Sequence, residues 1–244
     1  MDIATFQTLL TPPGQSALEE AEALQPTEEG FLPLFDRLQK RFPPQLARAA
    51  LETAILRRKG RDKFTRAGQM YFTRDGLEQA TGEIVAVHRA ERYRPFRRAA
   101  DLCCGLGGDT LALAAVTETV GVDIDPLRLA LAAENVRAYG RAAQFEPLDL
   151  LRDPPPPQFR TAAAALFFDP GRRAGGRRIH SVRGYHPPLA LVADWLEHTP
   201  AIGAKLSPGV DKAELAGYDA ELEFVSVRGE LKEAALWWGP LKTA

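Results

Sequence analysis

The sequence has little cysteine, no long apolar run and no clear excess of either charge. Its two cysteines are adjacent, so no disulfide framework can form from them. No spacing of His, Cys, Asp or Glu resembles a metal site, and we expect no metal. No apolar stretch reaches the roughly 18 residues of a membrane span, and no secretory leader is visible. These absences predict a soluble, cytoplasmic protein with no membrane partner.

Charge is local rather than global. The formal net charge is -1, from 31 Lys and Arg and 32 Asp and Glu, so the overall balance does not indicate nucleic acid. Basic residues gather in three runs, at 57–63, 89–98 and 172–178. Such runs are either solvated faces or contacts for phosphate groups, and both interpretations stay open here.

The hydrophobic pattern divides the chain into two parts. The first 90 residues show helical periodicity and almost no strand signal, with helices expected at 31–42, 45–59 and 77–93. From residue 99 onward, short apolar runs alternate with helical segments. We therefore expect a helical domain at 1–66, a connecting helical segment or lid at 67–98 and an α/β domain at 99–244.

The alternating half predicts a doubly wound parallel sheet. Strands are expected at 99–104, 119–124, 142–148, in the second half of 161–170, and at 201–207. Helices are expected at 109–116, 126–139, 187–198 and 212–218, with Pro126 in the first turn of the second and Gly140 past its end. The tail reads as two strands around a tight turn at Arg228-Gly229, which adds an antiparallel edge.

A glycine-rich turn, DLCCGLGGDT at 101–110, follows the first of these strands. Gly105, Gly107 and Gly108 let the backbone turn sharply and approach a ligand, and Asp109 can cap the next helix. The turn lacks the third glycine of a dinucleotide fingerprint and the Gly-Lys-Ser/Thr of a phosphate loop. Asp101 before the glycines disfavours a pyrophosphate and favours a cationic ligand.

Two further carboxylates follow at the ends of later strands. Asp123 ends the second strand, where it can accept both hydroxyls of a ribose, and Asp149 follows the third, where it can accept from a purine amine. The ligand predicted by this set is a nucleoside without phosphates and with a neutral or positive centre. S-adenosylmethionine fits that description.

With these residues in order, the chain from about 68 to 239 resembles the class I S-adenosylmethionine-dependent methyltransferases. DLCCGLGGD, VGVDIDPLRLALAAENVRAYG and FFDPGRR correspond to their first, second and fourth motifs. FTRDGLEQAT at 72–81 and KLSPGVD at 205–211 bring it nearest to bacterial methyltransferases with a C-terminal THUMP-like domain, and more distantly to trimethylguanosine synthases. The resemblance implies a Rossmann-like sheet of seven strands. That family's extra C-terminal domain is expected to be absent here.

The resemblance also implies a role for particular residues. At the methionine end of the cofactor it places Asp101, Cys103, Gly105 and Gly107, with Asp109 and Asp169 nearby and Phe72 and Thr73 closing over. Around the ribose and adenine it places Asp123, Ile124, Asp149 and Leu150. Cys103 and Cys104 are interpreted as pocket and core residues rather than nucleophiles, because nothing nearby marks an activated thiolate.

The stretch FFDPGRR, at 167–173, carries the substrate hypothesis. In amino-methylating relatives the matching motif is Asp/Asn/Ser-Pro-Pro-aromatic, whose first side chain and proline carbonyl accept from the target amine. Asp169 and Pro170 are retained as the expected catalytic pair, whereas Gly171 and Arg172 replace the second proline and the aromatic. Phosphate or base contacts are expected from the arginines that follow, Arg172, Arg173, Arg177 and Arg178. Alternatively, Asp169 pairs with one of these arginines and only shapes the loop.

The predicted function is therefore N-methylation of a nucleotide in RNA. A small-molecule or protein methyltransferase on the same scaffold, and a cofactor-binding protein without catalysis, remain alternatives because fold does not fix function. Tyr185, His180 and His186 could line the substrate side of the site. Alternatively, the histidines are loop residues without a catalytic role. The N-terminal helices are either a lid with a basic edge at Arg57, Arg58, Lys59 and Lys63, or a packing element. The sequence does not indicate an oligomeric state.

Overall fold

The fold is that of a computed structural model. It describes the chain except residues 175–176, 180 and 244, and except the side chains of residues 173, 174, 177 and 178. Seven strands form one sheet in the order β3-β2-β1-β4-β7-β9-β8. Their bounds are β1 Arg98–Leu102, β2 Glu118–Asp123, β3 Gln144–Pro147, β4 Ala164–Phe168, β7 Ala201–Leu206, β8 Glu221–Val227 and β9 Glu230–Trp238. The predicted α/β class and seven-stranded sheet are confirmed.

The first five strands of this sheet are parallel, and the last two form the antiparallel edge. The tight turn between β8 and β9 has Arg228 and Gly229 at positive φ, as the predicted hairpin requires. A further two-stranded ribbon, β5 Arg173–Ala174 with β6 Arg177–Arg178, follows β4 and was not expected from the sequence.

Adjacent residues of β4 fill the two opposite faces of the sheet. Phe167 lies edge-on to Tyr93, with ring centroids 6.4 Å apart, while Phe168 lies edge-on to Trp195 at 5.0 Å. Tyr93 follows helix α6 (Glu83–Ala90), and Trp195 belongs to α9 (Leu191–Leu196). Because successive side chains of a strand point to opposite faces, Phe167 and Phe168 pack into two different hydrophobic cores. Strand β4 is buried along its whole length.

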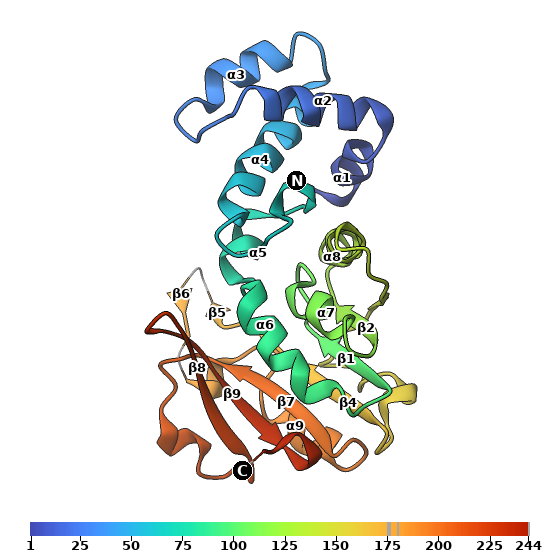
Figure 1. Cartoon of the computed structure of the whole chain (residues 1–244), viewed down its shortest axis with the longest axis vertical. Coiled ribbons are helices and arrows are strands. Elements are labelled where there is room, and N and C mark those ends of the chain that lie inside the picture. Colours follow the sequence, from blue (N-terminus) through green and yellow to red (C-terminus); the bar gives the residue numbers. More distant parts are fainter. Residues whose placement is uncertain (175–176, 180, 244) are drawn as a thin grey trace.

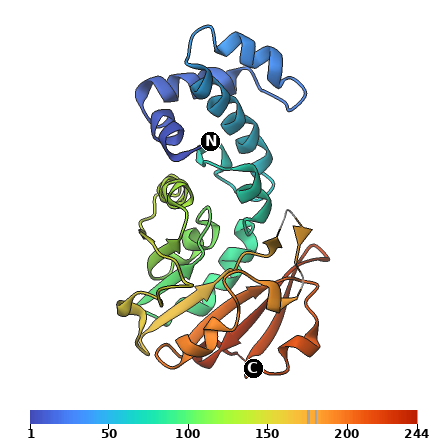
Figure 2. The ribbon, with the colours of Figure 1, turned by 180° about the vertical axis from the view of Figure 1, so that it is seen from behind.

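The N-terminal part is helical, with four helices at one end of the molecule (Figures 1 and 2). These are α1 Ile3–Leu9, α2 Pro12–Ala23, α3 Phe31–Leu38 and α4 Pro44–Gly60. Helices α4, α5 (Arg74–Gln79) and α6 then lead down to the sheet in Figure 1. The N-terminal helices share a hydrophobic core with Leu106 of the glycine turn and Leu131 of α8 (Pro126–Ala138).

Several predicted helices are shorter than the hydrophobic pattern suggested. The single helix expected at 77–93 is wrong: it is two helices, α5 and α6, because Ala80 adopts an extended backbone and Gly82 caps α6. The helix expected at 187–198 begins only at Leu191, after a turn at residues 189–190. Residues 212–218 form a short 3-10 turn, Lys212–Leu215, rather than an α-helix. The breaks before α6 and before α9 place loop residues 80–81 and 186–187 at the cavity described next.

Candidate active site

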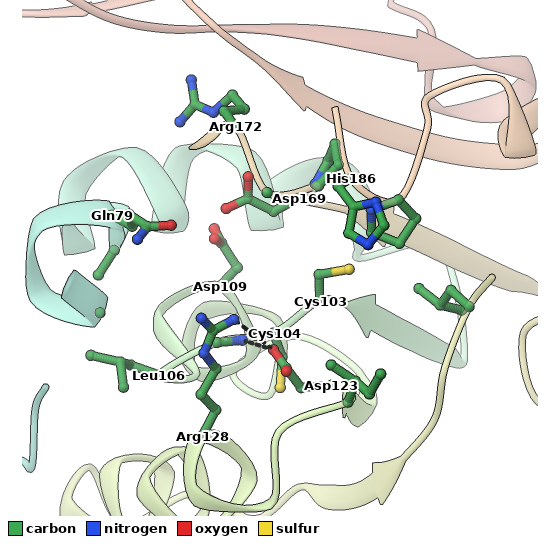
Figure 3. A pocket seen from close by; sticks show the side chains of 18 of the residues that line it. Gln79, Cys103, Cys104, Leu106, Asp109, Asp123, Arg128, Asp169, Arg172 and His186 are labelled. Atoms are coloured by element: carbon green, nitrogen blue, oxygen red, sulfur yellow. Dashed lines mark hydrogen bonds and ion pairs between the residues drawn. The ribbon is translucent and has the colours of Figure 1, made fainter. Parts of the chain in front are cut away.

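A cavity of about 330 Å³ opens at the carboxyl ends of β1, β2 and β4 (Figure 3). This is the edge where open α/β sheets bind ligands. One wall is the glycine turn after β1, a second follows β2 and β3, and a third follows β4. The fourth wall comes from outside the α/β domain, from Gly76 and residues 78–81 at the corner between α5 and α6.

The glycine turn has the backbone geometry that its sequence predicts. Gly105 and Gly107 have φ values of 56° and 77°, and a Cβ on Gly107 would lie 2.9 Å from the Ala132 Cβ on α8. Cys103 also has a positive φ, of 66°, which ends β1 at Leu102 instead of Cys104. Gly107, in the left-handed region, is the N-cap of α7 (Gly108–Leu113). The expected capping role of Asp109 is therefore wrong, because Asp109 lies inside the first turn.

Asp123 joins the glycine turn to the end of β2. One of its carboxylate oxygens accepts from the Gly105 N–H at 3.0 Å, and the other accepts from the Asp125 N–H at 3.0 Å. Arg128 lies on the solvent side, with its Nη1 3.9 Å from the carboxylate (Figure 3). Beside it, Ile124 lines the cavity with 63 % of its surface exposed. A fixed carboxylate next to an exposed apolar side chain suits the hydroxyls and the flat face of a nucleoside.

Asp169 reaches the cavity from the end of β4 and forms a buried ion pair. Its Oδ2 accepts from the Lys205 Nζ at 2.6 Å, and the Lys205 side chain is only 4 % exposed. Lys205 also donates to the Thr81 hydroxyl at 2.8 Å, and that hydroxyl donates to Asp109 at 2.9 Å. A chain of contacts thus runs from the α5–α6 corner to the end of β4. Among the described side chains, the cation paired with Asp169 is Lys205 and not Arg172. The alternative pairing with Arg173, Arg177 or Arg178 stays a prediction, because those side chains lie outside the described part of the chain.

Beneath the cavity, one arginine compensates two buried carboxylates. Arg89 of α6 is bonded to Asp109 and to Glu233 of β9, and its guanidinium lies 4.3 Å from the Phe167 ring centre. Burial raises the pKa of Asp109 although Arg89 opposes that shift. Burial, with the nearby Asp109 charge, raises the pKa of Asp101 to about 8. A pKa raised in this way favours the protonated form of Asp101 at neutral pH.

The loop after Asp169 folds back over the cavity. Gly171 and His186 form an antiparallel bridge, in which each backbone N–H donates to the other's carbonyl, at 2.8 Å and 3.0 Å. The Arg172 Nη1 donates to the Leu206 carbonyl at 3.2 Å. The side chains of Arg173, Arg177 and Arg178, and all of His180, lie outside the described part of the chain, so their predicted substrate contacts stay predictions.

The structure brings most of the predicted site residues to one cavity. Those that line it are Cys103, Gly105, Asp109, Asp123, Ile124, Asp149, Leu150, Asp169, Pro170 and Arg172. Four others do not line it: Asp101 is fully buried and accepts from the Thr110 hydroxyl at 2.5 Å, and Gly107 caps α7. Phe72 packs on Phe64, and Thr73 caps α5 by accepting from Gly76 at 3.1 Å.

Sequence reasoning assigned no role to the residues that support these walls. Thr81 and Lys205 carry the contacts described above, and they stand in the motifs FTRDGLEQAT and KLSPGVD; Lys205 is also a charge inside the apolar strand AIGAKLS. Asn135, buried in α8, exchanges hydrogen bonds with the Tyr71 backbone at 2.7 and 3.0 Å and donates to the Leu106 carbonyl at 2.9 Å. In the sequence, Asn135 stands out only as an amide on the apolar side of a predicted helix.

Part of the basic run at 57–63 is engaged in contacts within the fold, whereas Arg58 and Arg61 are exposed. The Lys63 Nζ donates to the carbonyls of Leu77, Glu78 and Ala80, at 2.7, 3.0 and 2.9 Å. Arg57 is buried and donates to the Met70 carbonyl, and Lys59 pairs with Glu28 at 2.7 Å. These contacts favour the packing role of the N-terminal helices over a basic edge for RNA.

None of the described helices combines the length and the apolar character that crossing a membrane requires. No cluster of three or more His, Cys, Asp or Glu side chains in the described chain is arranged to hold a metal ion.

Comparisons with known proteins agree with this geometry. Residues 96–148 match a family described as RNA cap guanine-N2 methyltransferase, and residues 2–60 match a domain of unknown function (DUF8688). Two proteins from two strains of Mycobacterium tuberculosis, both named uncharacterized S-adenosylmethionine-dependent methyltransferases, are 35 % identical over 196 residues. That alignment covers 77 % of this chain and 52 % of each relative, so the chain spans about half their length.

Among solved structures, a crystal structure from Porphyromonas gingivalis, provisionally assigned as a methyltransferase, superposes with a TM-score of 0.77. The superposition covers 100 % of this chain and 60 % of that one, at 22 % sequence identity. This likeness shows a shared fold that includes the N-terminal helices as well as the sheet.

Proposed function

We propose, from the premise that this chain is a class I S-adenosylmethionine-dependent methyltransferase in fold and in sequence similarity, that it methylates a nucleotide nitrogen in RNA. The observation that carries the proposal is the cavity in which Asp123 and the pair Asp169-Pro170 line different walls. The match of residues 96–148 to RNA cap guanine-N2 methyltransferases supports RNA as the substrate class.

The cavity has the features that S-adenosylmethionine needs. Asp123 is held by two backbone N–H groups and can accept from ribose hydroxyls, and Ile124 offers an exposed apolar surface to the adenine. Asp149 and Leu150 line the same end. The cofactor supplies an electrophilic methyl group, so the protein has mainly to align the nucleophile and exclude water.

The proposed role of Asp169 is to orient the target amine. Lys205 takes its Oδ2, and within the described residues no hydrogen bond is made to its Oδ1. Oδ1 and the Pro170 carbonyl can then accept the two N–H bonds of an amine, which directs the nitrogen lone pair toward the methyl group. Lys205 is a positioning residue in this scheme, because it fixes the carboxylate from the side opposite the substrate.

Finer parts of the prediction belong to the same proposal. We infer a helical domain at 1–66, a connecting segment at 67–98 and a catalytic domain at 99–244, and a subfamily likeness to the THUMP-like methyltransferases. The motifs FTRDGLEQAT and KLSPGVD support that likeness. We expect the protein to act in the cytoplasm, where its two free cysteines stay reduced.

The test separates cofactor binding from methyl transfer. Calorimetric titration should show that the wild type binds S-adenosylmethionine and its demethylated product, and Asp123→Ala should lose this binding. Methylation of RNA from cells lacking the protein should fall about 100-fold or more in Asp169→Ala. Asp169→Asn should keep part of the activity because its amide oxygen still accepts.

Each alternative has its own outcome in this test. Full turnover by Asp169→Ala with intact cofactor binding would sink the mechanism. Cofactor binding without any methylated RNA would favour a small-molecule or protein substrate, or a binding protein without catalysis. Absence of cofactor binding would overturn the central claim.

A further inference from the structure

The stretch after β4 contains a substitution that the sequence alone leaves unexplained. Where amino-methylating relatives carry a second proline and an aromatic, this chain has Gly171 and Arg172. The site therefore lacks, in its own motif, the flat side chain that would stack on a base. The folded chain shows what occupies that region instead.

Gly171 is needed for a backbone bridge. Its N–H donates to the His186 carbonyl at 2.8 Å, and a proline could not make this bond because it has no N–H. Any Cβ at position 171 would also lie 3.0 Å from the same carbonyl oxygen. The glycine and the close approach of His186 thus depend on each other.

The bridge brings a planar side chain to the rim of the cavity. His186 lines it together with Asp169 and Pro170, although it follows Asp169 by many residues in sequence, and its side chain is exposed. Figure 3 shows His186, Asp169 and Cys103 around the same cavity. The Arg172 guanidinium, by contrast, donates a hydrogen bond to the Leu206 carbonyl.

We propose that His186 supplies the stacking surface for the substrate base whose nitrogen faces Asp169. The inference rests on the proposed function, and it names a specificity residue of that same site. Imidazole rings stack on unpaired bases in RNA recognition, and the cost of losing one such contact corresponds to about 5- to 150-fold in affinity. An unpaired or flipped nucleotide is therefore the form of RNA that the site would take.

The experiment measures methylation of total RNA from cells lacking the protein, with S-adenosylmethionine labelled in its methyl group. His186→Ala should raise the apparent KM for RNA about 5- to 150-fold and leave the calorimetric Kd for S-adenosylmethionine unchanged. His186→Phe, which keeps a ring, should restore the KM to within about threefold, while His186→Leu should not. His198→Ala, at an exposed histidine just beyond α9, is the matched control and should behave as wild type.

The outcomes separate the inference from the function on which it rests. An active wild type with an unchanged KM in His186→Ala overturns the stacking role alone, as does rescue by leucine equal to rescue by phenylalanine. An equal loss of S-adenosylmethionine affinity would assign His186 to the cofactor instead. A wild type that methylates no RNA overturns the proposed function and the inference with it.

Discussion

Replacing Arg89 by methionine should destabilise the protein far more than removing a surface charge. Arg89 is the shared partner of Asp109 and Glu233, and the three side chains are 3 %, 9 % and 3 % exposed. Methionine fills much of the same volume but leaves two carboxylates buried without their cation. Breaking a buried ion pair in this way costs about 3–5 kcal/mol of unfolding free energy.

The corresponding change in melting temperature is large enough to measure directly. At about 2–4 °C per kcal/mol for a chain of this size, the loss amounts to about 6–20 °C. Circular dichroism melting at pH 7, with urea denaturation as a second measure, would report it. The matched control is Arg94→Met, whose exposed pair with Glu91 contributes about 0–1 kcal/mol.

Two results would refute this reasoning. The first is a melting temperature of Arg89→Met no lower than that of Arg94→Met. The second is additivity in the double variant Arg89→Met with Glu233→Gln, because residues that share a buried pair should show a coupling energy of about 0.5–3 kcal/mol.

Three further variants test other contacts. Lys63→Met leaves three carbonyls at the end of α5 without their hydrogen-bond donor. Amide hydrogen exchange at 77–81 should therefore accelerate, and the free energy of unfolding should fall by about 1–3 kcal/mol. Arg58→Met, at an exposed residue, should change neither quantity. Because the pKa of Asp101 is raised to about 8, its folded form holds a proton that the unfolded chain has released above about pH 4. Stability from Asp101 is therefore lost progressively as pH rises from about 4 to about 8. Asp101→Asn should flatten that decline, and parallel melting profiles would contradict this. Asn135→Leu should lower the urea midpoint by removing the bonds between α8, Tyr71 and Leu106, and an unchanged midpoint would show that they contribute nothing.

The sequence predicts best what depends on local order along the chain. Gly105, Asp123 and Asp169 each lie at or just after the carboxyl end of a strand, and parallel strands bring these ends to one edge. Their convergence at one cavity therefore required only the alternation of strands and helices.

Contacts between distant segments were beyond that reasoning. Lys205 is hydrogen-bonded to Thr81, 124 positions away in the sequence, and hydrophobic periodicity does not predict contacts between such distant residues. The break between α5 and α6 was missed for a related reason: Leu77, Val85 and Ala86 continue an apolar pattern through residues whose backbone is extended. His186 reaches the cavity only through a backbone bridge, which depends on hydrogen-bonding groups that every residue carries.

The α5–α6 corner has a practical consequence for anyone who cuts this chain into modules. The two matched families cover 2–60 and 96–148, and they leave residues 61–95 between them. That interval nevertheless contains Lys63, the cavity wall at 78–81 and Arg89. A fragment that begins at residue 99 would keep the glycine turn, Asp123 and Asp169 but lose the wall at residues 78–81, which would leave the cavity open on one side. The part of the chain that forms the cavity is therefore larger than the two segments that the matched families cover.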